Sequence, residues 1–348
     1  MDNKRHITFI INPISGTHTK KQLPQLIGEI IDADKFTYDI RNTEYAGHAA
    51  EMARQCVADG VDIVVAIGGD GTVNEVARSV VHSKTALGIV PCGSGNGLAR
   101  HLCIPLDVRK ALELINRCDT EDFDYGVING QPFFCTCGMG FDAFISLKFA
   151  ESGKRGPITY VENVLKEGLK YRPETYELID ESSTHRHKAF LIACANASQY
   201  GNNAYIAPGA TMKDGLMDVI IMEPFDTLDA PQIAADLFMK TLGNNSKIKT
   251  FRTRSIKIHR DHPGAIHYDG DPMMTDRDVE VHIEHLGIRI IVNPEAPEDK
   301  AQPNQMLNAF SDFFNNINNV RDDIQDEIGR GGRRIQAINK LLLRKLRS

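Results

Sequence analysis

The N-terminal part of the chain alternates short apolar runs with stretches of helical periodicity. We expect strands at ITFIIN, FTYDIR, IVVAI and ALGIVP, and helices over Lys20 to Ile31, Gly47 to Ala58 and Val73 to Val81. Apolar runs this short, bounded by turn residues and separated by helices, are typical of a parallel sheet covered on both faces. The pattern predicts an α/β, Rossmann-like three-layer domain.

The pattern changes after about Asp124, where several segments alternate apolar and polar residues. These segments are YELID, KAFLIACANA, LMDVIIME, SIKIHR, DVEVHIEH and IRIIVN. Alternation of this kind indicates antiparallel strands with one solvated face. We therefore predict a nucleotide-binding domain over 1–124 and a mainly antiparallel β domain over 125–293, whose last strands can return to the first domain. Helices are expected within it around residues 158–171 and 230–242.

Residues 294–348 are predicted to form a linker and an amphipathic helical extension. Apolar residues recur at helical spacing over 306–324, which favours a helix docked on its own protein. The segment 330–348 carries seven arginine and lysine residues and no acidic residue around an apolar stripe. Such a helix suits the surface of an anionic membrane, although a solvated or protein-docking arm explains the pattern equally well.

Composition limits the classes of function. The 348 residues carry a net charge of −6, which argues against a general nucleic-acid-binding surface. The seven cysteines form no disulfide framework, so a reducing, cytoplasmic setting is expected. No apolar run approaches the roughly 18 residues needed to span a bilayer. We expect a protein that reaches a membrane, if at all, from the water side.

Candidate chemistry begins with a strand that ends in Gly68, Gly69, Asp70 and Gly71 before a helix opens at Thr72. Glycines let the backbone approach a phosphate, and successive N–H groups at a helix start bind anions. A carboxylate at such a site needs a magnesium ion or a transferable proton beside it, so Asp70 is a candidate ligand or base. The plainer interpretation is a turn in which Asp70 caps the helix.

Two further loops support a phosphate site. Gly93, Ser94, Gly95 and Asn96 lie between the next strand and helix, and two such loops on neighbouring strands are expected to meet. The opening segment NPISG adds polar groups from Asn12 and Ser15. The sequence contains no G-x-x-x-x-G-K-[ST] motif, so the protein is not a P-loop enzyme.

Together, NPISG, GGDGTVNEV and PCGSGNGLARHL resemble the catalytic domain shared by diacylglycerol kinases, sphingosine kinases, ceramide kinases and bacterial lipid kinases. DYGVIN, GMGFDA, KRGPITY, KDGLMDV and YDGDP follow in the order of that family, so the resemblance covers roughly residues 5–293. It implies a fold of the NAD kinase and diacylglycerol kinase type, with a β-sandwich second domain. It also implies ATP as co-substrate, Mg²⁺ as cofactor, and transfer of the γ-phosphate to a lipid hydroxyl.

The resemblance also assigns residues. It implies nucleotide binding by Asn12, Pro13, Ser15, Gly16, Thr43, Gly68, Gly69, Asp70, Gly71, Thr72, Asn74, Glu75, Gly93, Ser94, Gly95 and Asn96. It implies a magnesium site at Asp214 with the carbonyls of Thr211 and Leu216, and Asp124 in the same network. Asp142 and Asp269 are expected to contact the substrate. By itself, Asp-Gly before a strand is most often a plain turn.

Two carboxylates compete as general base. Bacterial relatives mostly carry glutamate where Asp271 stands, and aspartate shortens the reach by one methylene group. Sphingosine kinases are thought to use the aspartate of the glycine loop, which here is Asp70. We expect both to be required. A hairpin turn is the plainer interpretation of YDGDP.

Three functions remain open. The first is a lipid kinase acting on diacylglycerol, a sphingoid base or a related lipid at a membrane surface. The second is a kinase of soluble substrates related to NAD kinase or phosphofructokinase. The third is a lipid-binding regulatory protein with weak turnover. Strand edges and the helical extension each allow a homodimer, and no nucleic-acid partner is expected.

Overall fold

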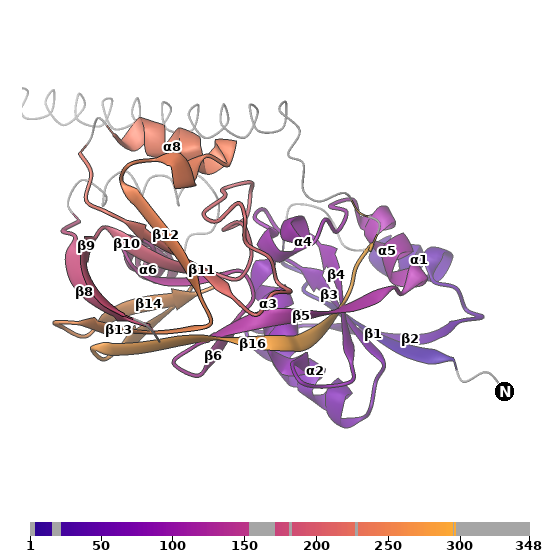
Figure 1. Cartoon of the computed structure of the whole chain (residues 1–348). Helices are drawn as coiled ribbons and strands as arrows, with labels where there is room; N and C mark the ends of the chain where they lie inside the picture. The colour runs from indigo at the N-terminus through magenta and orange to yellow at the C-terminus, as the bar shows by residue number, and fades with distance from the viewer. Residues whose placement is uncertain are drawn as a thin grey trace, which may run out of the picture.

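The computed structural model describes residues 4–15, 22–152, 171–180, 183–226, 229–294 and 296. In them the chain forms a ten-stranded and a six-stranded sheet. Figure 1 shows the α/β part of the molecule beside the β-rich part. The predictions for Gly16, for KRGPITY and for the C-terminal extension from 297 onward lie outside the described residues. No helix in the described part is long and apolar enough to cross a membrane.

Four parallel strands form the N-terminal part of the larger sheet, in the order β2-β1-β3-β4. They are β1 (Arg5–Ile11), β2 (Phe36–Asn42), β3 (Ile63–Gly68) and β4 (Ala86–Pro91). Helices α1 (Leu23–Ile30) and α5 (Val108–Arg117) pack together on one face, and α2 (His48–Ala58) and α3 (Asp70–Val80) on the other. Because both faces are covered, β3 and β4 are buried throughout.

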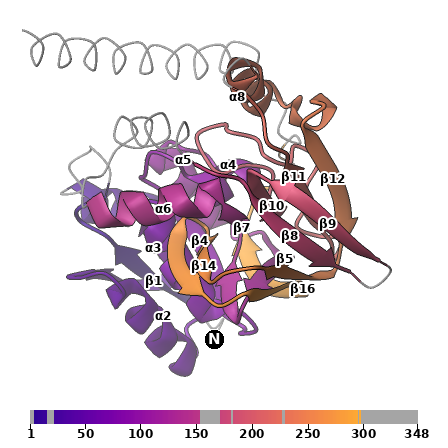
Figure 2. The same cartoon turned by 90° about the vertical axis from the view of Figure 1, so that its left-hand side faces the viewer.

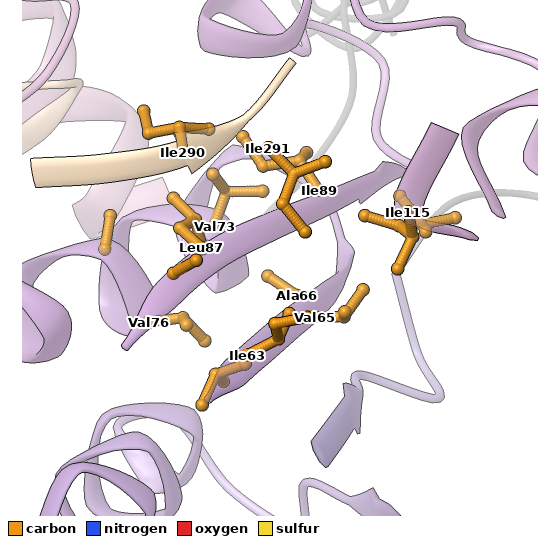
Figure 3. Close-up of a cluster of buried hydrophobic side chains, with 14 of the residues drawn as sticks. Ile63, Val65, Ala66, Val73, Val76, Leu87, Ile89, Ile115, Ile290 and Ile291 are labelled. Carbon is orange, nitrogen blue, oxygen red and sulfur yellow. The ribbon is translucent and has the colours of Figure 1, made fainter. Parts of the chain in front are cut away.

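The core of this layer explains why these strands need no polar positions. Figure 3 shows side chains of β3 and β4 between α3 and α5, with the end of the last strand alongside. The labelled members are Ile63, Val65, Ala66, Val73, Val76, Leu87, Ile89, Ile115, Ile290 and Ile291. Burying each large aliphatic side chain contributes about 1.5–3 kcal/mol. The predicted α/β layer is confirmed.

The second part is a β-sandwich, also as expected. The six-stranded sheet has the antiparallel order β12-β11-β10-β7-β14-β15. Its strands are β7 (Thr136–Gly140), β10 (Leu191–Ala195), β11 (Met217–Met222), β12 (Ile248–Thr253), β14 (Gly264–Tyr268) and β15 (Asp271–Thr275). The facing layer extends the larger sheet with β8 (Glu174–Ile179), β9 (Thr184–Ala189), β13 (Ser255–Arg260) and β16 (Asp278–Ile291). Ile192 and Val219 from one sheet and Ile258 and Val281 from the other share a core.

Strand β16 joins the two parts (Figure 1). It pairs with β13 near its start, with β5 (Thr120–Ile128) along most of its length, and with β4 at Ile290. Strand β6 (Gln131–Phe133) pairs with β5. The prediction of two separate strands, DVEVHIEH and IRIIVN, was wrong, because both belong to β16. The single strand changes register between Glu284 and Ile288, where Leu286 has a φ of 50°, and this irregularity interrupts the alternation of the sequence.

Other boundaries also differ from the expected ones. The segment KAFLIACANA was predicted as one strand, but it breaks at Phe190 because the chain passes there from β9 in one sheet to β10 in the other. Helix α3 begins at Asp70 rather than near Val73. The remaining elements are α4 (Gly97–His101), α6 (Phe141–Ser152), α8 (Ala230–Met239) and the 3-10 turn Leu242–Asn244. Figure 2 shows α6 lying across the edge of β14.

Candidate functional site

The polar loops of the α/β layer lie at the carboxyl ends of its parallel strands. Asn12 follows β1, Thr43 follows β2, Gly69 follows β3 and Cys92 follows β4. The chain leaves β1 and β3 in opposite directions, since β1 leads to the outer strand β2 and β3 leads to β4. Open α/β sheets bind ligands at such a reversal of strand order. The first three of these positions are among the predicted nucleotide-binding residues.

The two glycine loops touch each other through their backbones. A Cβ atom added to Gly93 would lie 2.6 Å from the Cα of Gly69 and 2.9 Å from the Oδ1 of Asn96. A Cβ on Gly68 would lie 2.5 Å from the side chain of Thr72. Real Cβ atoms do not approach other atoms this closely, so these positions need glycine. The structure therefore brings the loops after β3 and β4 together, as their spacing indicated.

Gly93 offers a direct test of this contact. We expect Gly93→Ala to lower the free energy of unfolding by about 1–3 kcal/mol, because the new methyl group forces apart two backbone segments. It should also weaken nucleotide binding. Urea unfolding and nucleotide titration measure the two effects. Gly209→Ala is the matched control, since a Cβ there has no neighbour within 4 Å and the residue lacks a left-handed φ. Equal stability of both variants would contradict the prediction.

Asp70 connects the loops through its carboxylate. Its Oδ2 accepts the N–H of Asn96 at 2.8 Å, and its Oδ1 accepts the N–H of Gly97 at 2.7 Å. Asn96 is the N-cap of helix α4 and Gly97 is its first residue, so these N–H groups lie at the start of that helix. The alternative that Asp70 caps its own helix is wrong, because Gly69 holds the N-cap position of α3 and Asp70 is its first helical residue. Asp70 instead fixes the position of the GSGNG loop.

Side chains at the same edge hold the surrounding loops. The Nδ2 of Asn12 donates to the Oγ1 of Thr72 at 3.0 Å, which ties the first loop to α3. The hydroxyl of Ser15 donates to the carbonyl of Asn12 at 3.1 Å. Glu75 accepts N–H groups at the start of α2, from Gly47 at 2.9 Å and Ala49 at 3.2 Å. These contacts surround the two glycine loops, in which Gly71 and Ser94 are exposed and Gly69 and Gly93 are half-buried.

The remaining predicted nucleotide residues lie in the loops after β1, β2 and β4 or in the first turns of α3. Asn96 has a left-handed backbone with a φ of 49°, and its side chain closes the second loop by bonding both the N–H and the carbonyl of Gly93. Thr43 and Asn74 are buried, whereas Pro13, Gly71 and Ser94 are exposed and Gly95 is half-buried. The hydroxyl of Ser94 therefore lies on the accessible side of the loop.

Asp271 is held to the helix that starts at the glycine loop. Its Oδ2 accepts from the Nη1 of Arg78 on α3 at 2.9 Å, and its side chain is 50% exposed. Arg78 also donates to the carbonyls of Pro132 and Tyr268 and stacks over the Tyr268 ring at 4.6 Å. At about 1.5 Å rise per residue, Arg78 lies roughly 12 Å along α3 from Asp70. Sequence reasoning missed this arginine.

Asp271 stands at the end of a two-residue hairpin turn. Asp269 and Gly270 have left-handed φ values of 51° and 87°, and Tyr268 pairs with Asp271 across β14 and β15. The hairpin expected as the plainer interpretation is therefore present, with Asp271 as the first residue of β15. Asp269 is half-buried and accepts N–H groups from Phe134, Cys135 and Thr136. Burial raises the pKa of Asp269 against these bonds, and the carboxylate fixes the turn.

Asp142 lies under the same hairpin. Its Oδ2 bonds the Nε2 of His267 at 3.0 Å, and the Tyr200 hydroxyl is 3.4 Å away. The Nδ1 of His267 accepts the N–H of Gly270 at 3.4 Å. Asp142 and His267 are therefore both buried supports of the turn that carries Asp271. Apart from the order of the motifs, nothing in the sequence indicated these supporting roles.

The predicted metal ligands do not fit a magnesium ion. Both oxygens of Asp214 are engaged, one by the N–H of Leu216 at 3.1 Å and the other by Arg252. Asp124 is fully buried, and its carboxylate accepts three hydrogen bonds, from Gly215, His285 and Leu286. The guanidinium of Arg252 already lies against Asp214, so a divalent ion there would meet a positive charge, and Thr211 and Leu216 would add only neutral carbonyls. In the described part of the chain, no group of three or more His, Cys, Asp or Glu residues could hold a metal.

Comparison with known proteins gives two family models that divide the chain. Residues 6–128 match the diacylglycerol kinase catalytic domain, and residues 136–291 match the YegS C-terminal NAD kinase β-sandwich-like domain. Lipid kinase YegS of Escherichia coli is 27% identical over 275 residues, covering 77% of this chain and 90% of YegS. An uncharacterised protein of Synechocystis, sll0036, is 27% identical over 282 residues; the match covers 76% of this chain and 65% of the longer relative.

A solved structure shares the fold. The crystal structure of a diacylglycerol kinase from Bacillus anthracis superposes with a TM-score of 0.66 at 20% identity, covering 84% of this chain and 98% of that one. The similarity extends over the α/β layer and the sandwich together. At this identity it shows the architecture, and the arrangement of residues described above stands on its own contacts.

Proposed function

The chain belongs to the diacylglycerol kinase catalytic-domain family of lipid kinases, and on this premise we propose that it transfers the γ-phosphate of ATP to a hydroxyl group of a membrane lipid. The observation that carries the proposal is the contact between the glycine loops after β3 and β4, joined by Asp70. Their N–H groups and the start of α3 suit a polyphosphate.

The base in this proposal is Asp271. Both oxygens of Asp70 accept backbone N–H groups, so its role is to hold the loop in place. Asp271 is half exposed, and Arg78 engages one of its two oxygens. The other oxygen can accept the proton of the acceptor hydroxyl as the γ-phosphate is attacked in line. Arg78 then has a positioning role, because it ties Asp271 to the helix of the phosphate loop.

Magnesium enters this proposal only as the counter-ion that accompanies ATP. The residues assigned to a protein-bound ion do not fit one, so no step depends on it. Backbone N–H groups of the first glycine loop and of the start of α3 bind and orient the phosphates, since those of Gly93, Asn96 and Gly97 bond within the protein. Preorganised donors of this kind stabilise the charge that develops during transfer. Specific binding of ATP over other nucleotides is part of the proposal.

An aromatic cluster packs at the start of α6. Phe141 and Phe190 have ring centroids 4.5 Å apart, and Phe190 and Phe225 4.7 Å apart. Tyr171 packs against Phe141 and Phe190. The cluster includes the first turn of α6, which packs on β14 and β15. Tyr268, which faces Asp271, pairs with Cys137 on β7, whereas Phe141 follows Gly140 at the other end of that strand, so the cluster lies away from the proposed base. Support for a lipid acceptor therefore comes from the family match.

The test is transfer of label from γ-labelled ATP. Vesicles containing diacylglycerol, a sphingoid base or ceramide are offered beside NAD and fructose 6-phosphate as soluble acceptors. We expect labelled phospholipid in one of the vesicle samples. Label in a soluble acceptor alone would favour the NAD kinase or phosphofructokinase alternative and contradict the proposal. Mass spectrometry of products from a mixed lipid extract then identifies the acceptor.

One observation favours a second candidate, a regulatory lipid-binding protein with weak turnover. The ion pair with Arg78 engages one oxygen of Asp271, and aspartate is shorter than the glutamate that most bacterial relatives are expected to carry. Vesicle binding without label transfer would support this candidate. Peripheral membrane binding through residues 330–348 and a homodimer remain predictions, to be tested by co-sedimentation of the full and truncated chains.

A further inference from the structure

The loop before β11 is fastened to the rest of the molecule through hydrogen bonds to Asp124. Asp124 on β5 donates its N–H to the carbonyl of Met212 at 2.7 Å. Its carboxylate accepts the N–H of Gly215 at 2.7 Å and the N–H of Leu286 at 2.8 Å. The Nδ1 of His285 donates to it at 2.7 Å, since a carboxylate can only accept. The buried charge of Asp124 is thus compensated by three N–H donors.

Asp214 of this loop and Asp218 on the strand that follows share one cation. Asp218 on β11 lies directly opposite Arg252 on β12 in the register of the two strands. The Nε of Arg252 is 3.4 Å from the Oδ2 of Asp218, and its Nη2 forms an ion pair with the Oδ2 of Asp214. Asp218 is only 18% exposed, so its charge is poorly hydrated. The strand pairing therefore places the guanidinium between both acidic groups.

A guanidinium suits this position better than a hard cation. A magnesium ion beside Asp214 would stand next to the guanidinium that already contacts it, so the two cations repel each other and compete for the carboxylate. Arginine is planar and always charged, and it can contact two carboxylates with separate N–H groups. Burial lowers the pKa of Arg252, but the bond to Asp214 and the charge of Asp218 outweigh it and raise the pKa.

We propose that the guanidinium of Arg252 takes the place of a divalent cation at Asp214 and Asp218, so that the loop over residues 211–216 closes without metal. The inference concerns the free protein and is independent of the magnesium that accompanies ATP. Folding of the loop then needs no metal, whereas the proposed phosphoryl transfer still uses the magnesium that accompanies ATP. A failure of the kinase assay leaves it untouched.

The experiment uses the full chain, freed of metal and without nucleotide. Thermal unfolding is measured in EDTA and in millimolar Mg²⁺, and binding of Mn²⁺ is followed by electron paramagnetic resonance. For the wild-type protein we expect the same Tm in both buffers and no bound Mn²⁺. Arg252→Met should lower Tm by roughly 2–6 °C in EDTA, recover part of the loss in Mg²⁺, and bind Mn²⁺.

The matched control is Arg289→Met, which breaks an ion pair with Asp122 whose shortest contact is 2.8 Å. Asp122 and Arg289 are both partly exposed, so Tm should fall slightly and equally in both buffers. Stoichiometric Mn²⁺ binding by the wild-type protein, lost in Asp214→Asn, would overturn the proposal. So would an Arg252→Met variant that folds but neither binds Mn²⁺ nor gains Tm in Mg²⁺. If that variant does not fold, Arg252→Gln and the wild-type measurement decide.

Discussion

Replacing Asp70 with asparagine is expected to abolish phosphoryl transfer while the protein stays folded. The carboxylate accepts N–H groups of Asn96 and Gly97, and each such bond to a charged group contributes about 1.5–3 kcal/mol. Asparagine keeps one acceptor and turns an NH₂ group towards the other donor. The GSGNG loop then leaves its contact with the first glycine loop. We expect a loss of at least about 10²–10³-fold in rate.

The measurement is label transfer from γ-labelled ATP, with circular dichroism to show that the variant is folded. Asp107→Asn is the matched control. Asp107 caps α5 by accepting the N–H of Lys110 at 3.0 Å, so it loses the same kind of contact away from the site. Transfer by this control should be close to that of the wild-type protein. Unchanged turnover in Asp70→Asn would rule out the assignment of Asp70.

Replacing Asp271 with asparagine is expected to lower kcat by about 10²–10⁴-fold with little change in the KM for ATP. Asparagine keeps an oxygen that accepts from Arg78, so the hairpin stays in place and only the basic group is lost. Asp271→Glu restores a carboxylate with a longer reach and should retain activity. Steady-state kinetics with vesicle substrate separates kcat from KM.

Asp278→Asn serves as the control for this pair of variants. Asp278 is an exposed carboxylate at the start of β16, paired with His259, and its loss should leave kcat unchanged. An Asp271→Asn variant with wild-type kcat would show that Asp271 is not the base. A variant that loses ATP binding instead would show that Asp271 acts on the nucleotide site.

The general fold could be predicted because the apolar pattern reports burial directly. Strands β3 and β4 are apolar throughout and are covered on both faces, and the alternating segments became the sandwich. What the pattern misplaced were points where the backbone changes sheet or register, such as Phe190 and Leu286. At these points the side-chain alternation shifts. For that reason KAFLIACANA looked like one strand although it forms two, and β16 looked like two strands although it is one.

The site could be predicted as far as its glycine loops, because close backbone approach needs glycine whatever the partner. The partners of its charged residues could not be predicted, because they lie far away in the sequence. Asp70 bonds N–H groups 26 and 27 positions further along the chain, and Asp271 bonds Arg78 across 193 positions. Arg252 likewise reaches Asp214 only because β11 and β12 pair. Arg78 gave no signal of its own, since the residues around it in α3 include the polar Glu75 and Ser79.

The long strand β16 also constrains how the protein is made. Its final residues complete the core between β4 and α5, yet they are among the last described residues to leave the ribosome. Until then the N-terminal layer exposes the edge of β4 and the apolar surface that Ile290 and Ile291 later cover. Such an edge favours pairing with other chains. Nascent chains ending before residue 288 should therefore depend on chaperones, whereas those that include β16 fold as one cooperative unit.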